Sequence, residues 1–213
     1  MIDTVIFENQ YGDVFMPYEQ DGIYMKSHSI SPPTPRIHRF SLDGMDGALD
    51  MTDWAGEVKF EPREVQIAFR DMSADTYTAL VQFCLGRMVK IMFSDDLDHY
   101  LYGRCDAADV ATERRVSDYD MKFTCEPYRL ERFLTTVERT VDQSAEITLR
   151  ARRMTATPTI TVTAACALEF DGETYELEAG THEMSGIRIT DRPKVLSVTG
   201  STGITITWRD GIL

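Results

Sequence analysis

Apolar and polar side chains alternate along much of the first 130 residues. Val65, Ile67 and Phe69 form one such series, and Met121 and Phe123 belong to another. A period of two is typical of a β-strand that buries one face against a core. Both stretches are therefore predicted to be half-buried strands of a sheet.

One segment between these strands has helical spacing instead. Tyr77 and Leu80 lie three residues apart, and further apolar residues follow at the same kind of spacing. A helix with one apolar face has this pattern. Ser73 or Asp75 can cap its first turn, and Gly86 can end it. This is the one helix that the pattern predicts.

A polar segment follows, between two alternating stretches at residues 89–93 and 99–103. Its carboxylates are those of Asp95, Asp96 and Asp98, and His99 follows at the start of the second stretch. Three carboxylates could bind a hard cation, but the central glycine and the closing glutamate of an EF-hand loop are missing. Aspartate is also favoured in turns for backbone reasons. We predict a hairpin with a solvated turn and no metal site.

The pattern changes in the second half, where threonine becomes abundant and short alternating stretches follow one another without a helix. Asp171 and Gly172 separate two of these stretches, which predicts a two-residue hairpin turn. A further turn between two strands is predicted at residues 200–203. Evenly spaced short strands are typical of a small β-sandwich. We therefore predict a mainly β chain with two domains, residues 1–133 and 134–213.

The composition narrows the classes of function. The 213 residues include 35 acidic and 22 basic side chains, which gives a formal net charge of −13. Residues 1–133 hold 24 of the acidic and 14 of the basic side chains, so most of the excess lies in the first domain. A protein that grips nucleic acid or an anionic membrane needs clustered Lys and Arg, so neither partner is expected. No apolar stretch approaches the length of a membrane span, and no signal peptide is visible.

Side chains suited to catalysis or metal binding are sparse. The four cysteines show no CxxC spacing and are expected to be small buried side chains in a reducing cytoplasm. The four histidines have no nucleophile or carboxylate at a recognised spacing, and P-loop, GxSxG, HExxH and GxGxxG motifs are missing. Asp118 and Asp120 share one face of a strand, but such pairs occur in any acidic protein. We predict no catalytic residue, no cofactor and no metal, and hence no enzyme.

Carbohydrate binding by the second domain is an alternative. Small β-sandwiches can stack a sugar on an exposed aromatic ring, and Trp208 or Tyr175 could supply that ring. Trp208 also continues the alternation of Ile204 and Ile206, which favours a position in the core. The sequence alone leaves both interpretations open.

The most distinctive stretch joins a proline-rich segment at residues 31–35 to a segment rich in Asp and Gly at residues 42–52. Phe-Glu-Pro-Arg follows at residues 60–63 and leads into an alternating strand. Beyond the predicted helix come residues 86–104, with an acidic turn and a Tyr-Leu-Tyr-Gly-Arg end, and then residues 123–128. In this order the stretches resemble the distal tail protein (Dit) family of long-tailed bacteriophages and their prophages.

The resemblance implies an architecture and a role. In that family an N-terminal β-sandwich with one α-helix and an extended β-hairpin precedes a small galectin-like or carbohydrate-binding-module-like β-sandwich. Six copies form a ring hub that connects the tail tube to the baseplate or tail tip and surrounds the channel for DNA. Expected partners are further copies of the chain, the major tail tube protein, a tail-tip protein and the tape-measure protein, without stable nucleic-acid binding or a membrane. The expected location is the distal end of the virion tail, after assembly in the host cytoplasm.

The resemblance also suggests where subunits meet. A cyclic ring uses heterologous contacts, in which different faces of neighbouring copies meet. The candidate interface or structural residues are Gly44, Asp46, Gly47, Trp54, Arg63, Tyr77, Tyr100 and Tyr102. For each of them, packing within its own domain is an equally open alternative. The 80 residues of the second domain leave no room for the large saccharide-binding insertions of some relatives.

Overall fold

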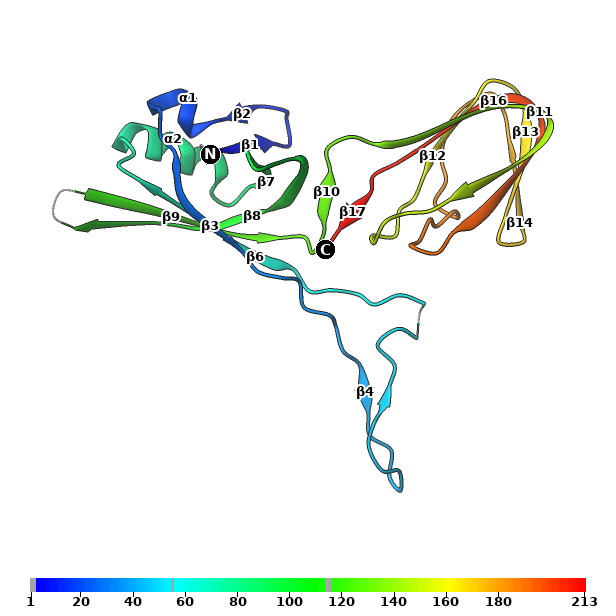
Figure 1. The fold of residues 1–213 in the computed structure, drawn as a ribbon, viewed down its shortest axis with the longest axis horizontal. Helices are drawn as coiled ribbons and strands as arrows, with labels where there is room; N and C mark the ends of the chain where they lie inside the picture. Colours follow the sequence, from blue (N-terminus) through cyan, green and yellow to red (C-terminus); the bar gives the residue numbers. More distant parts are fainter. Residues whose placement is uncertain (1–2, 55, 114–115) are drawn as a thin grey trace. The chain divides into compact units, whose positions relative to one another are not determined.

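The computed structural model describes residues 3–54, 56–113 and 116–213. Contacts divide the chain into two compact units, Met1–Arg129 together with Leu213, and Leu130–Ile212. The boundary expected from the sequence, after residue 133, falls slightly later. The chain is mainly β, as predicted, and each unit is described by itself (Figure 1). Among the described residues, no helix is long and apolar enough to cross a membrane.

The first unit is built on one antiparallel sheet. In their order across the sheet, its strands are β2 (Val14–Phe15), β1 (Val5–Asn9), β7 (Met88–Phe93), β8 (Asp96–Glu113), β9 (Val116–Cys125), β6 (Arg63–Arg70) and β3 (Met25–Ile30). Phe7 on β1 and Phe123 on β9 are not on neighbouring strands, yet their rings stack with centroids 5.8 Å apart. The sheet therefore curls until its two parts face each other across a shared core, which gives the predicted β-sandwich.

The two strands that the alternation predicts are neighbours in this sheet. β6 pairs with β9, so that Val65 lies opposite Phe123 and Ile67 lies opposite Met121. These four side chains, and that of Phe69 on the same face, are at most 1% exposed. The period of two in the sequence thus places one continuous apolar face against the core.

The predicted helix is present as α2 (Ala74–Cys84). Of the two residues that could cap it, Ser73 does so, because its Oγ accepts a hydrogen bond from the backbone N–H of Thr76 at 3.1 Å. Asp75 lies inside the first turn instead. Gly86 follows the helix with a φ of 73°, in the left-handed region that glycine adopts without strain.

A second, short helix corrects the prediction of a single one. α1 (Pro17–Asp21) begins on a proline, whose fixed φ suits the first turn of a helix. It ends at Gly22, which has a φ of 67°. Five residues are too few for a helical period to appear in the sequence, which is why the pattern did not predict α1.

The hairpin that follows α2 has a tighter turn than predicted. β7 ends at Phe93 and β8 begins at Asp96, so two residues form the turn. Asp96 and Asp98 therefore lie within β8 and not in the loop, and His99 lies in the strand as predicted. β8 then continues and pairs with β9 in a second hairpin.

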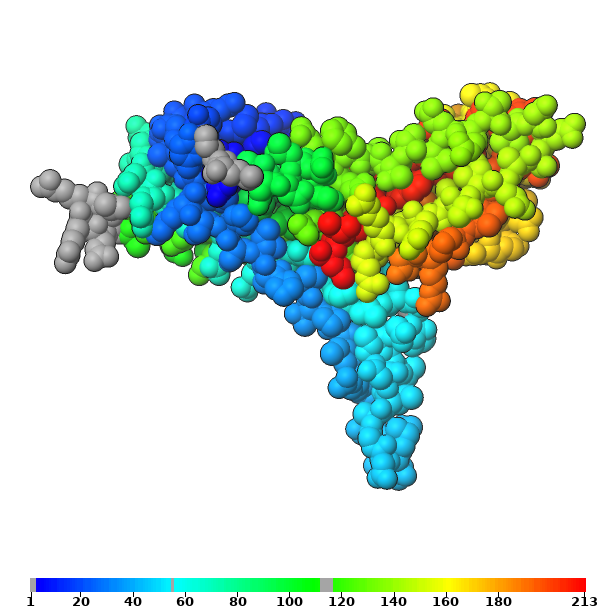
Figure 2. Space-filling view, viewed as in Figure 1, coloured from blue at the N-terminus to red at the C-terminus, as the bar shows by residue number. Residues whose placement is uncertain are grey.

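Residues 31–62 leave the sheet between β3 and β6, and we call them the arm. In Figures 1 and 2 the arm, coloured blue to cyan, projects away from the remainder of the first unit. Its outer part is a short hairpin of β4 (Arg39–Phe40) and β5 (Leu49–Asp50). The sequence predicts an extended, irregular connection here, and the structure differs in that part of this connection forms a regular hairpin.

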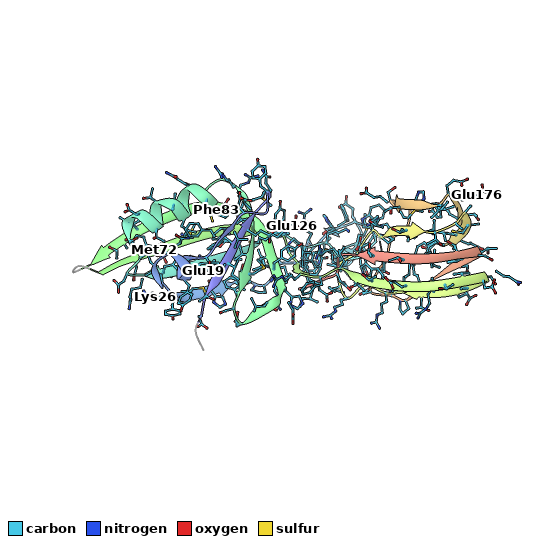
Figure 3. The ribbon with its side chains drawn as sticks, turned by 90° about the horizontal axis from the view of Figure 1, so that it is seen from above. Glu19, Lys26, Met72, Phe83, Glu126 and Glu176 are labelled. Carbon is cyan, nitrogen blue, oxygen red and sulfur yellow. The ribbon has the colours of Figure 1, made fainter. Side chains whose placement is uncertain are left out.

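The second unit is an antiparallel sheet of two long and four short strands. They are β11 (Thr135–Leu149), β12 (Thr159–Val162), β13 (Cys166–Phe170), β14 (Glu173–Leu177), β15 (Gly180–Glu183) and β16 (Lys194–Trp208). β11 pairs with β16 over its full length, and Figure 3 shows these two strands running side by side in green and red. On the other edge of β16, β12 pairs with the C-terminal part and β13 with the N-terminal part. β15 and β14 pair with β12 and β13. Outside this sheet, two short strands, β10 (Arg129–Glu131) and β17 (Gly211–Ile212), pair with each other.

This sheet folds over a single core. Ile204 and Trp208 lie in its β12–β15 half, whereas Leu168 and Leu196 lie in its β13–β14 half, and all four belong to one buried cluster. They are at most 4% exposed. A flat sheet of six strands leaves both faces open to water, so burial this complete requires the two halves to face each other as in a small β-sandwich.

The turn predicted at residues 200–203 is wrong. These residues lie inside β16 and pair with β11, where Gly200 faces Gln143. The glycines serve close approach: a Cβ on Gly200 would lie 3.2 Å from the Cβ of Cys166, and one on Gly203 would lie 3.3 Å from the side chain of Thr163. The link between β12 and β13 thus packs against β16 where the sheet folds over.

The other predicted turn of the second half is confirmed. Asp171 and Gly172 join β13 to β14 with φ angles of 53° and 84°. Two successive positive φ angles give the twist that a two-residue hairpin needs, and Asp-Gly is a favoured pair for it.

Candidate assembly surfaces

The arm carries four of the candidate interface residues. Pro32, Pro33 and Pro35 keep its outgoing side extended, because proline fixes its own φ and disfavours helix at the preceding residue. The two sides of the arm are joined by backbone hydrogen bonds, such as that from the Arg36 N–H to the Lys59 carbonyl at 2.8 Å. The arm is therefore a two-sided ribbon whose order comes mainly from its backbone.

The tip of the arm depends on glycine. Gly44 and Gly47 have φ angles of 85° and 87°, a region that other residues adopt only with strain. Below the tip, the Arg39 Nε lies 3.3 Å from the Asp50 carboxylate across the short hairpin. Asp46 is exposed between the two glycines and forms part of the outer surface.

The arm also exposes large apolar side chains. They are Ile37, Phe40, Leu42, Met45, Leu49 and Trp54. Their exposed fractions range from 43% to 76%, with Trp54 the highest. An isolated two-stranded ribbon has no core in which to bury such groups, and grouped apolar exposure marks an interaction surface. Trp54 thus lies where an interface residue can lie, and its contact with another subunit stays a prediction.

The acidic hairpin holds an internal polar network and not only a solvated turn. The Asp96 carboxylate lies 2.7 Å from the His99 Nδ1 and 3.2 Å from the Arg129 Nη1. A pocket of about 160 Å³ adjoins these residues, and Tyr100 also lines it. Within the described residues, no three potential ligands gather closely enough to hold a metal ion. Asp96 and His99 therefore contribute to the structure of the first unit, whereas Asp98 is exposed as expected.

The candidate tyrosines of the first unit pack within it. The ring of Tyr77 on α2 lies 4.6 Å from that of Tyr119, and burial raises the pKa of the Tyr77 hydroxyl. The Lys90 ammonium lies 5.6 Å from the centre of the Tyr100 ring, a cation–π distance. Tyr102 is half-buried on β8. All three are partly accessible, so packing within the unit accounts for part of each side chain.

Arg63 is the candidate whose environment differs most from an open surface. Its side chain is 3% exposed at the start of β6, and its Nη2 donates a hydrogen bond to the Pro127 carbonyl. Arg63 has the same strand parity as Val65 and Ile67, so it points to the buried side of the sheet. Its role as a surface contact is therefore restricted to a partner that reaches into the pocket beside it.

In the second unit, neither of the two candidate sugar-stacking residues has the open, exposed ring that stacks on a sugar. Trp208 is 4% exposed and belongs to the core, as its alternation with Ile204 and Ile206 predicts. A buried ring cannot stack on a sugar, so this part of the alternative is corrected. Tyr175 is half-buried, packs against the same core and donates a hydrogen bond from its hydroxyl to Glu173 at 3.0 Å.

The cysteines are confirmed as buried side chains outside any disulfide. Burial raises the pKa of the Cys105 thiol to about 11 and that of Cys125 to about 12. It also raises the pKa values of Cys84 and Cys166. These thiols stay protonated at neutral pH, and the thiolate is the form that reacts or binds a metal.

On the surface of the first unit, one carboxylate forms ion pairs with two basic side chains. The Asp118 carboxylate lies 2.6 Å from the Lys26 Nζ and 3.0 Å from the Arg70 Nε. Hydrogen bonds from Arg70 and Lys26 lower the pKa of Asp118 to about 2. Asp118 therefore acts as an ion-pair partner that links β9 with β3 and β6, and not as an acid–base pair with Asp120.

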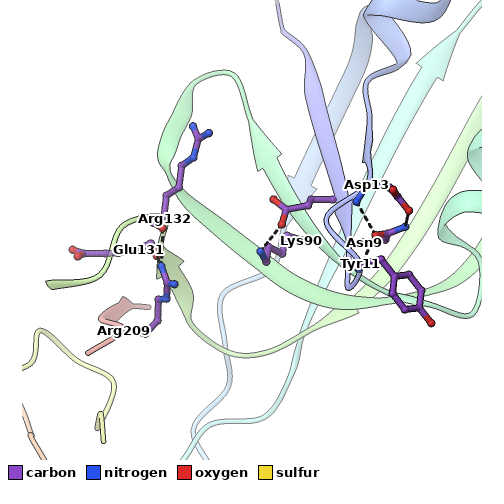
Figure 4. A network of polar contacts seen from close by, with 8 residues as sticks. Asn9, Tyr11, Asp13, Lys90, Glu131, Arg132 and Arg209 are labelled. Carbon is purple, nitrogen blue, oxygen red and sulfur yellow. Dashed lines mark hydrogen bonds and ion pairs between the residues drawn. The ribbon is translucent and has the colours of Figure 1, made fainter. Parts of the chain in front are cut away.

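Two further polar groupings are not evident from the sequence (Figure 4). In the first unit, the Asn9 Oδ1 accepts hydrogen bonds from the N–H groups of Tyr11 and Asp13 at 2.8 and 3.0 Å, which fixes the turn between β1 and β2. In the second unit, the Arg209 Nη1 donates to the carbonyls of Glu131 and Arg132 at 2.6 and 2.7 Å. Both stabilise chain segments that have little apolar burial of their own.

No protein-family model and no curated protein sequence matches the chain. Among solved structures, the chain is similar to the SPP1 Dit (gp 19.1) protein, described as a paradigm of the hub adsorption apparatus in phages that infect Gram-positive bacteria. The match has a TM-score of 0.67 at 16% sequence identity and covers 100% of both chains. A de novo designed double-stranded β-helix matches 37% of the chain with a TM-score of 0.25 and 13% identity, and carries no argument. At these identities the likeness to SPP1 Dit shows the fold, and it confirms the architecture that the family resemblance implies.

Proposed function

We propose that the chain is a distal tail protein of a long-tailed phage or prophage, and that it forms the hub between the tail tube and the baseplate or tail tip. The observation that supports this most is the likeness to SPP1 Dit over the full length of both chains. Both units are included in that match, so it concerns the whole chain and not one common β-sandwich. The ordered motifs of residues 25–130 support the same role independently.

In this proposal six copies form a closed ring. Heterologous contacts close such a ring, and each copy then needs two different surfaces. The arm suits one of them, because it exposes large apolar side chains that no core of its own covers. A permanent contact of this kind buries at least about 1,200 Å² in total. The arm of each copy would contact the second, different surface of the neighbouring copy.

In such a ring the net negative charge of the chain affects both subunit assembly and the passage of DNA. Six chains with a net charge of −13 carry 6 × −13 = −78 charges before counter-ions, so subunit contacts must overcome considerable self-repulsion. Carboxylates that face the channel repel DNA and let it pass without binding. A structure of the ring with a basic channel wall would contradict this part of the proposal.

The partners in this proposal are the major tail tube protein on one side of the ring and a tail-tip protein on the other, with the tape-measure protein in the channel. The chain contributes contacts and not chemistry, with no cofactor and no catalytic residue assigned. The proposed location is the distal end of the virion tail.

Native mass spectrometry and negative-stain microscopy test the proposal. The chain is measured alone and together with the tail tube and tail-tip proteins of the same phage or prophage. The expected particle has a mass of about 145 kDa, six times the 24.2 kDa of one chain, and a six-fold projection. A monomer alone is compatible with assembly on a partner, but a chain that stays monomeric with both partners contradicts the ring.

The position of the gene gives a second test. A distal tail protein is expected between a tape-measure gene and a tail-tip gene. A location without any tail genes nearby contradicts the proposal, whatever the oligomeric state.

A further inference from the structure

A pocket of about 530 Å³ lies in the first unit, where the arm leaves β3 and returns to β6. Residues 30–33 line it together with Arg63, Arg129 and Leu213, all of which belong to this unit. Ile30, Pro32 and Pro33 provide apolar surface, and the two arginines provide positive charge. Two guanidinium groups thus lie at one pocket of a chain that has an excess of acidic residues.

Arg63 is buried without a counter-charge among the described residues. One of its N–H groups donates to the Pro127 carbonyl, and its Nε is buried without a hydrogen-bond partner. The charged group that acts on it at neutral pH is Arg129, and no carboxylate acts on it among the described residues. A buried charge is costly unless it is paired. The structure of this chain alone therefore leaves the charge of Arg63 uncompensated.

Arg129 adds to this imbalance. Its Nη1 lies 3.2 Å from the Asp96 carboxylate, which is also hydrogen-bonded to His99, and its Nε is buried without a partner. Burial and the nearby charge of Arg129 both lower the pKa of Arg63. Among the described residues, the ion pair of Arg129 with Asp96 is thus the one that joins either arginine to a side-chain carboxylate, and Arg63 keeps its charge unpaired.

We propose that this pocket binds the carboxylate of an acidic side chain carried by another protein chain, with Arg63 as the principal donor and Arg129 as the second. A guanidinium presents N–H groups in a planar fork that matches the two oxygens of a carboxylate. The apolar lining suits the methylene groups of a glutamate or aspartate and the backbone beside them. The volume, far larger than one carboxylate, suits a peptide segment and not a free inorganic ion.

The charge of the surroundings favours a protein partner over nucleic acid. Residues 1–133 carry ten more acidic than basic side chains, 24 against 14, so a polyanion is repelled before it reaches the pocket. One carboxylate on an otherwise neutral or basic segment meets much less repulsion. The proposal does not depend on the number of copies in an assembly, because any chain with a reachable acidic side chain can supply the carboxylate.

A titration of the full-length protein with two matched probes tests the site. N-acetyl-glutamate amide carries the carboxylate, and N-acetyl-glutamine amide is its neutral counterpart of the same shape. In protein labelled with ¹⁵N-arginine, the first probe is expected to shift the Arg63 Nε–H resonance saturably, and the second is not. Equal responses to the two probes overturn the proposal.

Variants separate the pocket from general charge effects. Arg63→Met is expected to weaken binding of N-acetyl-glutamate amide at least about tenfold, the loss of one charge-assisted hydrogen bond. Arg39→Met removes the same charge from the exposed arm and is expected to leave binding unchanged. Unchanged binding in Arg63→Met, or equal weakening in Arg39→Met, overturns the proposal.

A third variant keeps the test decisive if Arg63→Met does not fold, which the amide spectrum of the protein reveals. Arg129→Gln changes a half-buried side chain and is expected to weaken binding of the acidic probe severalfold while the fold is kept. If Arg129→Gln binds as the unchanged protein does, the site is not the one proposed. Binding by a monomer supports the site even where the ring is not found, so the two proposals fail separately.

Discussion

Gly200 on β16 lies directly opposite Gln143 on β11, and both residues have a positive φ, of 131° and 109°. Two long paired strands thus depart from the ordinary extended conformation at the same pair of opposite residues. This is also where the link between β12 and β13 packs against β16. The paired distortion lets the two 15-residue strands bend, so that the sheet folds over one core.

Replacing Gly200 by alanine is expected to destabilise the second unit. The new Cβ would lie 3.2 Å from the Cys166 Cβ and 3.3 Å from the Ala165 carbonyl oxygen, at a φ that alanine rarely adopts. Backbone strain and overpacking together cost about 1–3 kcal/mol of the free energy of unfolding. Urea unfolding followed by Trp208 fluorescence, in a Trp54→Phe background, measures this loss.

Gly203→Ala is the matched control for that prediction. It lies on the same strand without a positive φ, and its new Cβ would meet only side-chain atoms of Thr163, at 3.3 Å. A small adjustment of one side chain relieves this contact, so the loss is expected to be clearly smaller. Equal losses at the two glycines would contradict the idea that Gly200 is required by its backbone conformation.

Polar substitutions on the arm are expected to separate assembly from folding. Phe40 and Trp54 are 54% and 76% exposed, so Phe40→Ser together with Trp54→Ser removes little burial from the single chain. The free energy of unfolding is expected to change by no more than about 0.5 kcal/mol. If the arm is one side of the subunit contact, the same protein loses the ring in native mass spectrometry.

Tyr11→Ser provides the comparison for the arm variants, because Tyr11 is 77% exposed and lies outside the arm. It is expected to assemble as the unchanged protein does. Rings that persist in the double arm variant show that the contact lies elsewhere on the chain.

The alternation of apolar and polar residues predicts more of this structure than the positions of glycine residues do. The period of two placed Val65 and Phe69 in the core, and it placed Trp208 there as well. The same parity includes Arg63, and it is the signal by which the burial of this arginine could have been predicted. Its charge suggested the surface, but the register of a strand with one buried face decides where its side chains point.

Glycine predicts a turn at both Asp171–Gly172 and residues 200–203, but the structure has a turn only at the first of these two sites. The two sites differ for a physical reason. Glycine permits both a tight turn and the close approach of another chain segment, and only the tertiary packing distinguishes the two. The packing of Thr163 against Gly203 joins residues 40 positions apart, which local sequence does not report. The exposed apolar residues of the arm were likewise hidden, since the same residue types form the core elsewhere.

Asp118 is expected to make stability depend on pH in the acidic range. Hydrogen bonds from Arg70 and Lys26 lower its pKa to about 2, below the usual value of 3.8. A lowered pKa in the folded state means that the ion pairs stabilise fully above about pH 4 and lose this effect as the pH falls toward 2. Carboxyl NMR titration of the folded protein is expected to give a midpoint near 2 for Asp118.

Asp118→Asn checks the same ion pairs through unfolding. The variant is expected to be less stable than the unchanged protein at neutral pH, and the difference is expected to shrink as the pH is lowered toward 2. A difference that stays constant over this range would assign the effect of Asp118 to packing and not to its charge.

The thiols are expected to resist alkylation in the folded protein. Cys105 and Cys125 are at most 1% exposed, and burial raises their pKa values to about 11 and about 12. The thiolate is the reactive form, so iodoacetamide at pH 8 is expected to label neither in the native protein and both in urea. Leu85→Cys places a thiol at a position that is 45% exposed, and mass spectrometry is expected to show rapid native labelling there alone. Native labelling of Cys105 at the rate of the introduced cysteine would mean that the core around β8 opens readily.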